Sequence, residues 1–296
     1  MSTYQFKQVD AFTARPFFGN PVAVVLGADA LDTDQMQRIA AWTNLSETTF
    51  VLEPTVAPPA YRLRIFTPDH ELPFAGHPTI GSCHAVLEAG IVSAGDGRLV
   101  QECGGGNLPL RVEGSGPLRR IYVEAPVAQP AGDFPDRIGD LSKALACRLP
   151  DTLPPAAFNN GPDWLFVQFG DGAAVKSLKP DLQAMTALSR ELSIGGIAAF
   201  ALVNEGELAV HIRCFAPAAG IPEDPVTGSA NAALPAYLAR YGLLEQTGRE
   251  YVASQGTELG RDGRVHVRVL DDSGRAEIGG QAVTVVDGWI TIDPTA

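Results

Sequence analysis

One polar, proline-containing stretch occurs twice in the chain, and this repeat constrains the fold more than any other feature. The first copy has residues 64–68 (RIFTP) and 73–82 (PFAGHPTIGS), and the second has 213–217 (RCFAP) and 222–229 (PEDPVTGS). Phe66 and Phe215 are 149 residues apart in a chain of 296. A repeat of this length indicates a duplicated architecture, with two halves that we expect to face each other.

Each copy leads into a segment of small residues that is typical of a buried helix. We interpret His77 and Asp224 as the N-cap residues, because each is followed by a proline, which suits the first helical position. The N–H groups of a first helical turn and the helix dipole favour anions. With Gly228 and Ser229 in the second of these turns, the pattern predicts a site for a small carboxylate-bearing molecule.

The composition and net charge of the chain exclude several classes of function. The hydrophobic fraction of 45% over 296 residues suits two globular domains. The net charge of −12 argues against a nucleic-acid or anionic-membrane partner. No apolar run approaches about 18 residues, so we expect no membrane span, and the N-terminal residues do not resemble a signal peptide. The four cysteines lack metal-ligand spacing and indicate reduced thiols, so we expect a cytoplasmic protein without a metal.

The hydrophobic pattern predicts the same order of elements in both halves: strand, helix, strand, strand, central helix and then strands. The central helices are predicted at 78–89 and 226–240. Residues 13–21 are predicted as a turn because they contain Gly, Asn and Pro, and residues 126–130 are predicted as a linker because they are rich in Pro and Ala. The predicted halves are residues 1–125 and 126–296, and the last strand is able to return to the N-terminal half.

Glu47 is the first candidate for chemistry, because it precedes an apolar strand and has no carboxylate counterpart in the second half. A carboxylate held near apolar groups has a raised pKa and is able both to take and to return a proton. A glutamate on a surface loop is the alternative, and the pattern alone favours it. His77 and Asp224 are interpreted either as a pair that holds the substrate or as plain helix caps, although histidine is not a favoured cap.

Several stretches together resemble the PhzF family of phenazine-biosynthesis-like isomerases. They are residues 18–24 (FGNPVAV), 44–50 (NLSETTF), 64–68 (RIFTP), 72–79 (LPFAGHPT) and 223–230 (EDPVTGSA). The resemblance implies an α+β fold like that of diaminopimelate epimerase. That fold has two pseudo-symmetric domains, each a bent, mostly antiparallel sheet wrapped around a central helix.

The resemblance also implies roles for individual residues. Glu47 is expected to be the general acid/base of a cofactor-free isomerisation that moves a proton within a small, carboxylate-bearing substrate. The substrate pocket is expected to contain Ser46 and, from the two copies of the repeat, Gly76, His77, Asp224, Gly228 and Ser229. A homodimer is expected from the family.

Two other functions remain open. An amino-acid racemase or epimerase needs a second base opposite Glu47. Related epimerases use one cysteine from each half, and the corresponding places near Ala75 and Pro225 carry no thiol. A non-catalytic module that binds small anions is the second alternative, and the retained Glu47, His77 and Asp224 argue against it.

Overall fold

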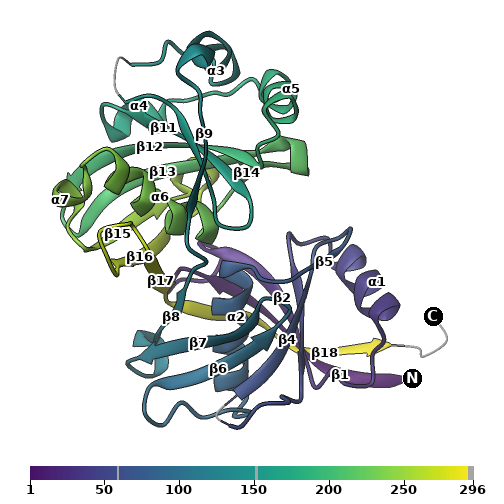
Figure 1. The fold of residues 1–296 in the computed structure, drawn as a ribbon. Helices are drawn as coiled ribbons and strands as arrows, with labels where there is room; N and C mark the ends of the chain where they lie inside the picture. The colour runs from purple at the N-terminus through teal and green to yellow at the C-terminus, as the bar shows by residue number, and fades with distance from the viewer. Residues whose placement is uncertain (59, 151–152, 293–296) are drawn as a thin grey trace. The chain divides into compact units, whose positions relative to one another are not determined.

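The computed structural model describes residues 1–58, 60–150 and 153–292. The chain forms two compact units (Figure 1). The first contains residues 1–124 and the C-terminal segment from Gly279, and the second contains Ala125–Ile278. Residues 293–296, the end of the predicted C-terminal half, lie outside the described residues.

The sheet of the first unit is mostly antiparallel. Its neighbours run in the order β18, β1, β2, β3, β4, β6, β7 and β8, and the short β5 pairs with β4. The β2–β3 and β4–β6 pairs are parallel. The strands are β1 (Ser2–Ala11), β2 (Asn20–Leu26), β3 (Thr48–Leu52), β4 (Ala60–Phe66), β5 (Glu71–Leu72), β6 (Arg98–Cys103), β7 (Gly106–Glu113), β8 (Arg120–Glu124) and β18 (Ala282–Ile292).

Two helices cover opposite faces of this sheet. Helix α1 (Thr33–Thr43) packs on the face that presents Val25 and Phe50. Helix α2 (Gly76–Glu88) packs on β1, β2, β3, β8 and β18 (Figure 1). A Cβ on Gly81 would lie 2.3 Å from Cγ1 of Val22, so only glycine permits this approach. Val22 and Val25 point to opposite faces because side chains alternate along a strand.

The second unit repeats this plan. Its neighbours run β9, β10, β11, β12, β13, β15 and β16, β14 pairs with β13, and the β11–β12 and β13–β15 pairs are parallel. The strands are β9 (Gln129–Asp133), β10 (Ala156–Asn159), β11 (Asp163–Phe169), β12 (Gly196–Glu205), β13 (Leu208–Ala216), β14 (Ile221–Asp224), β15 (Glu250–Gln255) and β16 (Gly263–Val269). Strand β17 (Ala276–Gly280) leads back to the first unit.

Helices again lie on both faces of the second sheet. Helix α6 (Gly228–Arg240) places Tyr237 among Phe158, Phe166 and Phe200, with ring centroids 5.4–6.2 Å from that of Tyr237. The opposite core includes Leu165 and residues of α3 (Ile138–Ala144), α4 (Gly172–Lys176) and α5 (Leu182–Leu192). The short α7 (Leu244–Thr247) follows α6. The predicted fold class, sheets wrapped around central helices, is therefore confirmed.

The predicted helix caps are wrong. Helix α2 begins at Gly76 with Ala75 as its N-cap, so His77 lies inside the first turn. Pro78 is tolerated there because the first four N–H groups of a helix have no partner within the helix. Asp224 is the last residue of β14, and α6 begins at Gly228 with Thr227 as its N-cap. The predicted linker also differs, since residues 129–133 pair with β10 as strand β9.

The alignment of the two copies shifts within the repeat. Arg64 forms a bidentate ion pair with Glu71, seven residues later, whereas Arg213 forms the same pair with Glu223, ten residues later. The second hairpin is therefore three residues longer. The helices then match with a spacing of 152 residues, as the two N-cap residues show. The structural equivalent of His77 is consequently Ser229, and not Asp224.

Candidate active site

Glu47 lies in a short loop that both of its neighbouring elements hold in place. Helix α1 ends at Asn44 in a left-handed conformation, with φ of 53°, and β3 begins at Thr48. The hydroxyl groups of Thr43 and Thr48 are 2.6 Å apart, which ties the helix end to the strand start. The Glu47 carbonyl also accepts a hydrogen bond from the backbone N–H of Ala23 on β2. The loop therefore presents Glu47 where the parallel strands β2 and β3 begin.

The carboxyl group of Glu47 is mostly buried and lies beside the first turn of α2. Its Oε2 atom is 3.2 Å from Nε2 of His77, and the side chains are 14% and 8% exposed. Burial raises the pKa of Glu47 to about 7, although a hydrogen bond from Ser46 acts in the opposite direction. A carboxyl group with this pKa is able to accept and to donate a proton near neutral pH.

Asn20, the first residue of β2, completes this cluster. Its side chain is 1% exposed, and its Nδ2 is 3.4 Å from Nδ1 of His77. The sequence predicts a turn here, whereas the structure places Asn20 at the start of a strand, and nothing in the turn pattern indicates a site residue. Of the predicted residues, the first unit thus brings together Glu47, Ser46 and His77, with Gly76 at the start of α2.

In the second unit, Asp224 belongs to a polar network at the start of α6. Its Oδ2 accepts a hydrogen bond of 2.8 Å from the hydroxyl of Thr227. The amide of Gln255 donates to the Asp224 carbonyl and to the Thr227 hydroxyl, and accepts from the Thr227 N–H and from Asn231. The network fixes the segment between β14 and α6. Thr227 and Gln255 were not identified from sequence, because nothing in the pattern sets them apart from other buried polar residues.

Ser229, the second residue of α6, is oriented by a tryptophan. The indole N–H of Trp164 donates to Oγ of Ser229 at 2.9 Å, and the Asn160 amide donates to the Ser229 carbonyl. The hydroxyl oxygen accepts this hydrogen bond, and the hydroxyl group has one hydrogen of its own to donate. Gly228, immediately before it, is buried. Asp224, Gly228 and Ser229 thus lie within one short segment of the second unit.

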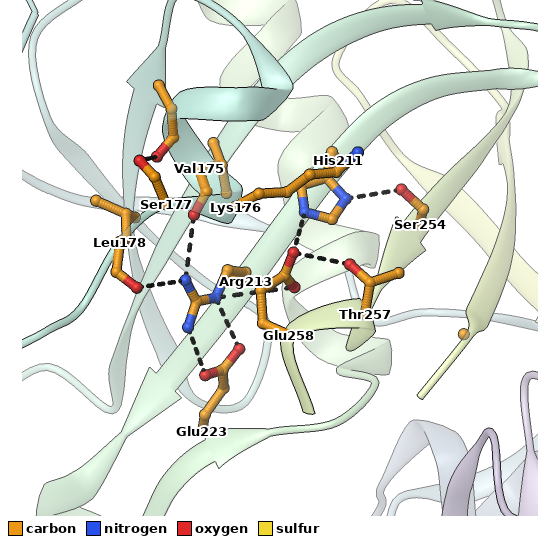
Figure 2. Close-up of polar contacts among 12 residues, drawn as sticks. Val175, Lys176, Ser177, Leu178, His211, Arg213, Glu223, Ser254, Thr257 and Glu258 are labelled. Carbon is orange, nitrogen blue, oxygen red and sulfur yellow. Dashed lines mark hydrogen bonds and ion pairs between the residues drawn. The ribbon is translucent and has the colours of Figure 1, made fainter. Parts of the chain in front are cut away.

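A buried ionic network supports the same segment from β13 and β15 (Figure 2). Arg213 binds Glu223 and also donates to the carbonyl groups of Val175 and Leu178. Glu258, in the turn after β15, lies 3.2 Å from Nε2 of His211, whose Nδ1 is 2.9 Å from Oγ of Ser254.

The turn that carries Glu258 lies directly against Pro225. A Cβ on Gly256, whose φ is +92°, would lie 2.5 Å from the Pro225 carbonyl oxygen. The ionic network therefore holds the turn that packs on the Asp224–Thr227 segment. No local pattern in the sequence indicates this role for Glu258.

The described residues contain no group of three His, Cys, Asp or Glu side chains placed to hold a metal ion. Cys83, Cys103, Cys147 and Cys214 are free thiols. The corrected alignment makes Ala75 and Thr227 the matching N-cap residues of the two central helices, and neither carries a thiol. Among the helices that the structure describes, none has the length and apolar composition of a membrane span.

Comparisons with known proteins indicate the same family over nearly the whole chain. The family model of phenazine biosynthesis-like proteins (PhzC-PhzF) matches residues 9–288. "Antisense-enhancing sequence 1" of Schizosaccharomyces pombe is 37% identical, over 97% of this chain and 99% of its own. Trans-2,3-dihydro-3-hydroxyanthranilate isomerase of Pseudomonas chlororaphis is 36% identical, over 96% of this chain and 98% of its own.

Solved structures extend the agreement to the fold. A PhzF-family phenazine biosynthesis protein of Bacillus anthracis has a TM-score of 0.87 and 30% identity, covering 99% of this chain and 100% of its own. A probable proline racemase of Agrobacterium radiobacter has a TM-score of 0.67 at 14% identity, covering 98% of this chain and 94% of its own, which is a likeness of fold alone. The matched family model, the similar isomerase and the shared fold lead to one conclusion: the chain belongs to the PhzC-PhzF family of phenazine biosynthesis-like proteins and is an isomerase of that type.

Proposed function

We propose that the protein is a cofactor-independent isomerase in which Glu47 is the only general acid/base. Glu47 takes a proton from one carbon of the substrate and returns it to another carbon on the same face. The C–H bond breaks as the carboxyl O–H bond forms, and the electron pair stays in the substrate until the proton returns. The observation that carries this proposal is the buried Glu47 carboxyl, with a pKa of about 7, beside His77.

We further propose that the substrate is a small ring bearing a carboxylate. The Pseudomonas chlororaphis relative is named for trans-2,3-dihydro-3-hydroxyanthranilate, which has this chemistry. His77 and Gly76 in the first unit, and Asp224, Gly228 and Ser229 in the second, are assigned to substrate binding. The start of α6 supports this role, because N–H groups at a helix start and an oriented serine hydroxyl suit a carboxylate. The homodimer implied by the family resemblance and the cytoplasmic location inferred from the cysteines stay predictions.

The test is Glu47→Gln, which keeps the side-chain shape and removes the base. With trans-2,3-dihydro-3-hydroxyanthranilate as substrate, we expect turnover to fall by at least about a hundredfold, the lower range for a general acid–base group. Glu53→Gln is the matched control, because Glu53 is exposed beyond the other end of β3. Near wild-type turnover by Glu47→Gln would assign the chemistry to another residue, with His77 the next to test.

Deuterium labelling separates this mechanism from the alternatives. A single shielded carboxyl group returns part of the label from a deuterated substrate to the product. A two-base racemase would instead introduce solvent hydrogen at the inverted carbon. A non-catalytic module would bind the substrate without converting it.

A further inference from the structure

Helix α2 is joined to strand β3 by two buried hydroxyl groups. The Oγ1 atom of Thr49 is 2.8 Å from Oγ of Ser82, and both residues are 0% exposed. The Thr49 hydroxyl also donates to the carbonyl oxygen of Ala23 on β2, at 3.1 Å. Because a hydroxyl group has a single hydrogen, Ser82 is the donor in its contact with Thr49. This hydroxyl bridge, Ser82 to Thr49 to the Ala23 carbonyl, thus joins α2, β3 and β2.

The hydroxyl bridge lies next to the contact between Glu47 and His77. Glu47 precedes Thr49 by two residues, and His77 precedes Ser82 by five. Two residues of extended chain span about 6.6 Å, and five residues of a helix span about 7.5 Å. The two contacts are therefore adjacent connections between the same strand and the same helix, and the bridge fixes how far α2 is displaced along β3.

The neighbouring glycine fixes the helix in a second direction. A Cβ on Gly81 would lie 2.3 Å from Cγ1 of Val22, so α2 already approaches β2 as closely as a helix can. Phe50 belongs to the core on the α1 face of the sheet, which leaves Thr49, its neighbour in the strand, on the α2 face. The glycine contact thus sets the height of α2 above the sheet, and the hydroxyl bridge sets its position along β3.

We propose that Thr49 and Ser82 are positioning residues, whose hydroxyl bridge holds the first turn of α2, and with it His77, against Glu47. This inference rests on the proposed role of Glu47 as the acid/base. Both hydroxyl groups are buried and engaged with each other, so they act through the position of His77, whose Nε2 is 3.2 Å from Oε2 of Glu47.

A helix without the bridge is free to slide along β3 and to uncover the Glu47 carboxyl group. His77 is the ionisable side chain that faces this carboxyl group from α2. Burial raises the pKa of Glu47 to about 7, so water admitted by a displaced helix would lower it. A bridge that served stability alone would leave this pKa unchanged.

Two substitutions of Thr49 separate its hydroxyl group from its size. Thr49→Val keeps the branched shape and removes the bridge, whereas Thr49→Ser keeps the hydroxyl group. With trans-2,3-dihydro-3-hydroxyanthranilate as substrate, Thr49→Val should lower kcat by about tenfold to a hundredfold, the scale for a small displacement at an active site. The change in KM should be smaller, and Thr49→Ser should retain most of the wild-type kcat.

The pKa of Glu47 is measured without any substrate. ¹³C NMR of protein labelled at the glutamate carboxyl carbons follows the titration, and the signal of Glu47 is the one that disappears in Glu47→Gln. We expect Thr49→Val and Ser82→Ala both to lower this pKa from about 7 toward the ordinary value of a glutamate. Ser82→Ala leaves the hydrogen bond from Thr49 to Ala23 in place, and it serves if Thr49→Val does not fold.

Ser189→Ala is the matched control. Ser189 is also a serine within a helix, on α5 of the second unit, and it is 1% exposed. Its substitution removes a buried hydroxyl group away from Glu47, and should leave kcat and the pKa of Glu47 unchanged.

A wild-type kcat in either Thr49→Val or Ser82→Ala, or an equal loss in Thr49→Ser, would overturn the inference. A lower kcat with an unchanged pKa of Glu47 would indicate a general loss of packing and would overturn it as well. The failure of the proposed function appears separately, as an active Glu47→Gln enzyme, because the titration is recorded without turnover.

Discussion

The two units each contain a buried glutamate beside a histidine, at the same distance but with opposite electrostatic outcomes. Glu47 and Glu258 are 14% and 12% exposed, and each has a carboxyl oxygen 3.2 Å from Nε2 of its histidine. Burial raises the pKa of Glu47 to about 7. Burial also opposes ionisation of Glu258, but hydrogen bonds from His211, Thr257 and its own backbone N–H lower its pKa to about 2.

The difference arises from the groups around each pair. Nδ1 of His211 faces the hydroxyl of Ser254, which donates to the Val210 carbonyl and so accepts from Nδ1–H. Ser254 therefore supports the His211 ring on the side away from Glu258, and the other ring nitrogen faces the Glu258 carboxyl group. His77 faces the amide donor of Asn20 instead. Similar histidine–glutamate contacts therefore accompany a lowered glutamate pKa in one unit and a raised glutamate pKa in the other.

The largest expected effect is a loss of stability, and it distinguishes the two equivalent arginine–glutamate pairs of the duplicated halves. The Arg213 and Glu223 side chains are 6% and 11% exposed, whereas those of Arg64 and Glu71 are 20% and 39% exposed. Arg213→Met leaves a buried carboxylate and two carbonyl groups without their donor, and should lower the free energy of unfolding by about 3 to 5 kcal/mol. Arg64→Met, the matched control, should lower it by at most about 1 kcal/mol. Urea unfolding measures both, and equal losses would contradict the comparison.

The two glutamates should affect stability with opposite signs as pH changes. A lowered native pKa stabilises the fold above the unfolded pKa of about 4.5. Glu258→Gln should therefore lower the free energy of unfolding by about 3 kcal/mol at pH 7, and by progressively less as the pH falls toward 2. A raised native pKa lowers stability at high pH. The free energy of unfolding of Glu47→Gln should therefore equal that of the wild type near pH 4 and exceed it by up to about 3 kcal/mol at pH 8. Unfolding curves at three pH values test both, and effects of the same sign would contradict the assigned pKa values.

The smallest expected effect is on ligand binding and concerns Ser229, the structural equivalent of His77. Trp164 donates to the Ser229 oxygen, and the serine hydroxyl group has one hydrogen of its own to donate to an anionic ligand. Ser229→Ala should weaken the binding of 3-hydroxyanthranilate by about 1 to 2 kcal/mol, the scale of a hydrogen bond to a charged group. Calorimetric titration measures this, with Ser93→Ala at an exposed position as the control. Unchanged affinity would place the carboxylate elsewhere.

Much of the fold was predictable because its signals are local. The central helix predicted at 78–89 is observed at Gly76–Glu88, and the one predicted at 226–240 is observed at Gly228–Arg240. The family also followed from short motifs, and the model match over residues 9–288 confirms it. The predicted N-cap residues are wrong because a polar residue precedes a proline in both copies, which suggests an alignment that the structure does not follow. The second hairpin is three residues longer, and the sequence pattern does not reveal this difference.

The site was predictable only in part. Glu47 and His77 stand out by residue type and by family resemblance, and the structure places them together. Asn20 lies in a segment whose glycine and proline indicate a turn, so its contact with His77 depends on how β2 starts beside α2. Glu258 lies next to His211, which is 47 residues earlier in the sequence, and no local pattern reveals this contact.

The pairing of β18 with β1 has a consequence for synthesis on the ribosome. Strand β1 runs from Ser2 to Ala11 and pairs with β18 along its whole length, but β18 begins only at Ala282. Residues 125–278 therefore emerge, with all the strands of their own sheet from β9 to β16, before the first sheet can be completed. Until then one edge of β1 is open to pairing with other chains. The sheet of the unit that is translated first is thus completed only after the whole of the second unit has been synthesised.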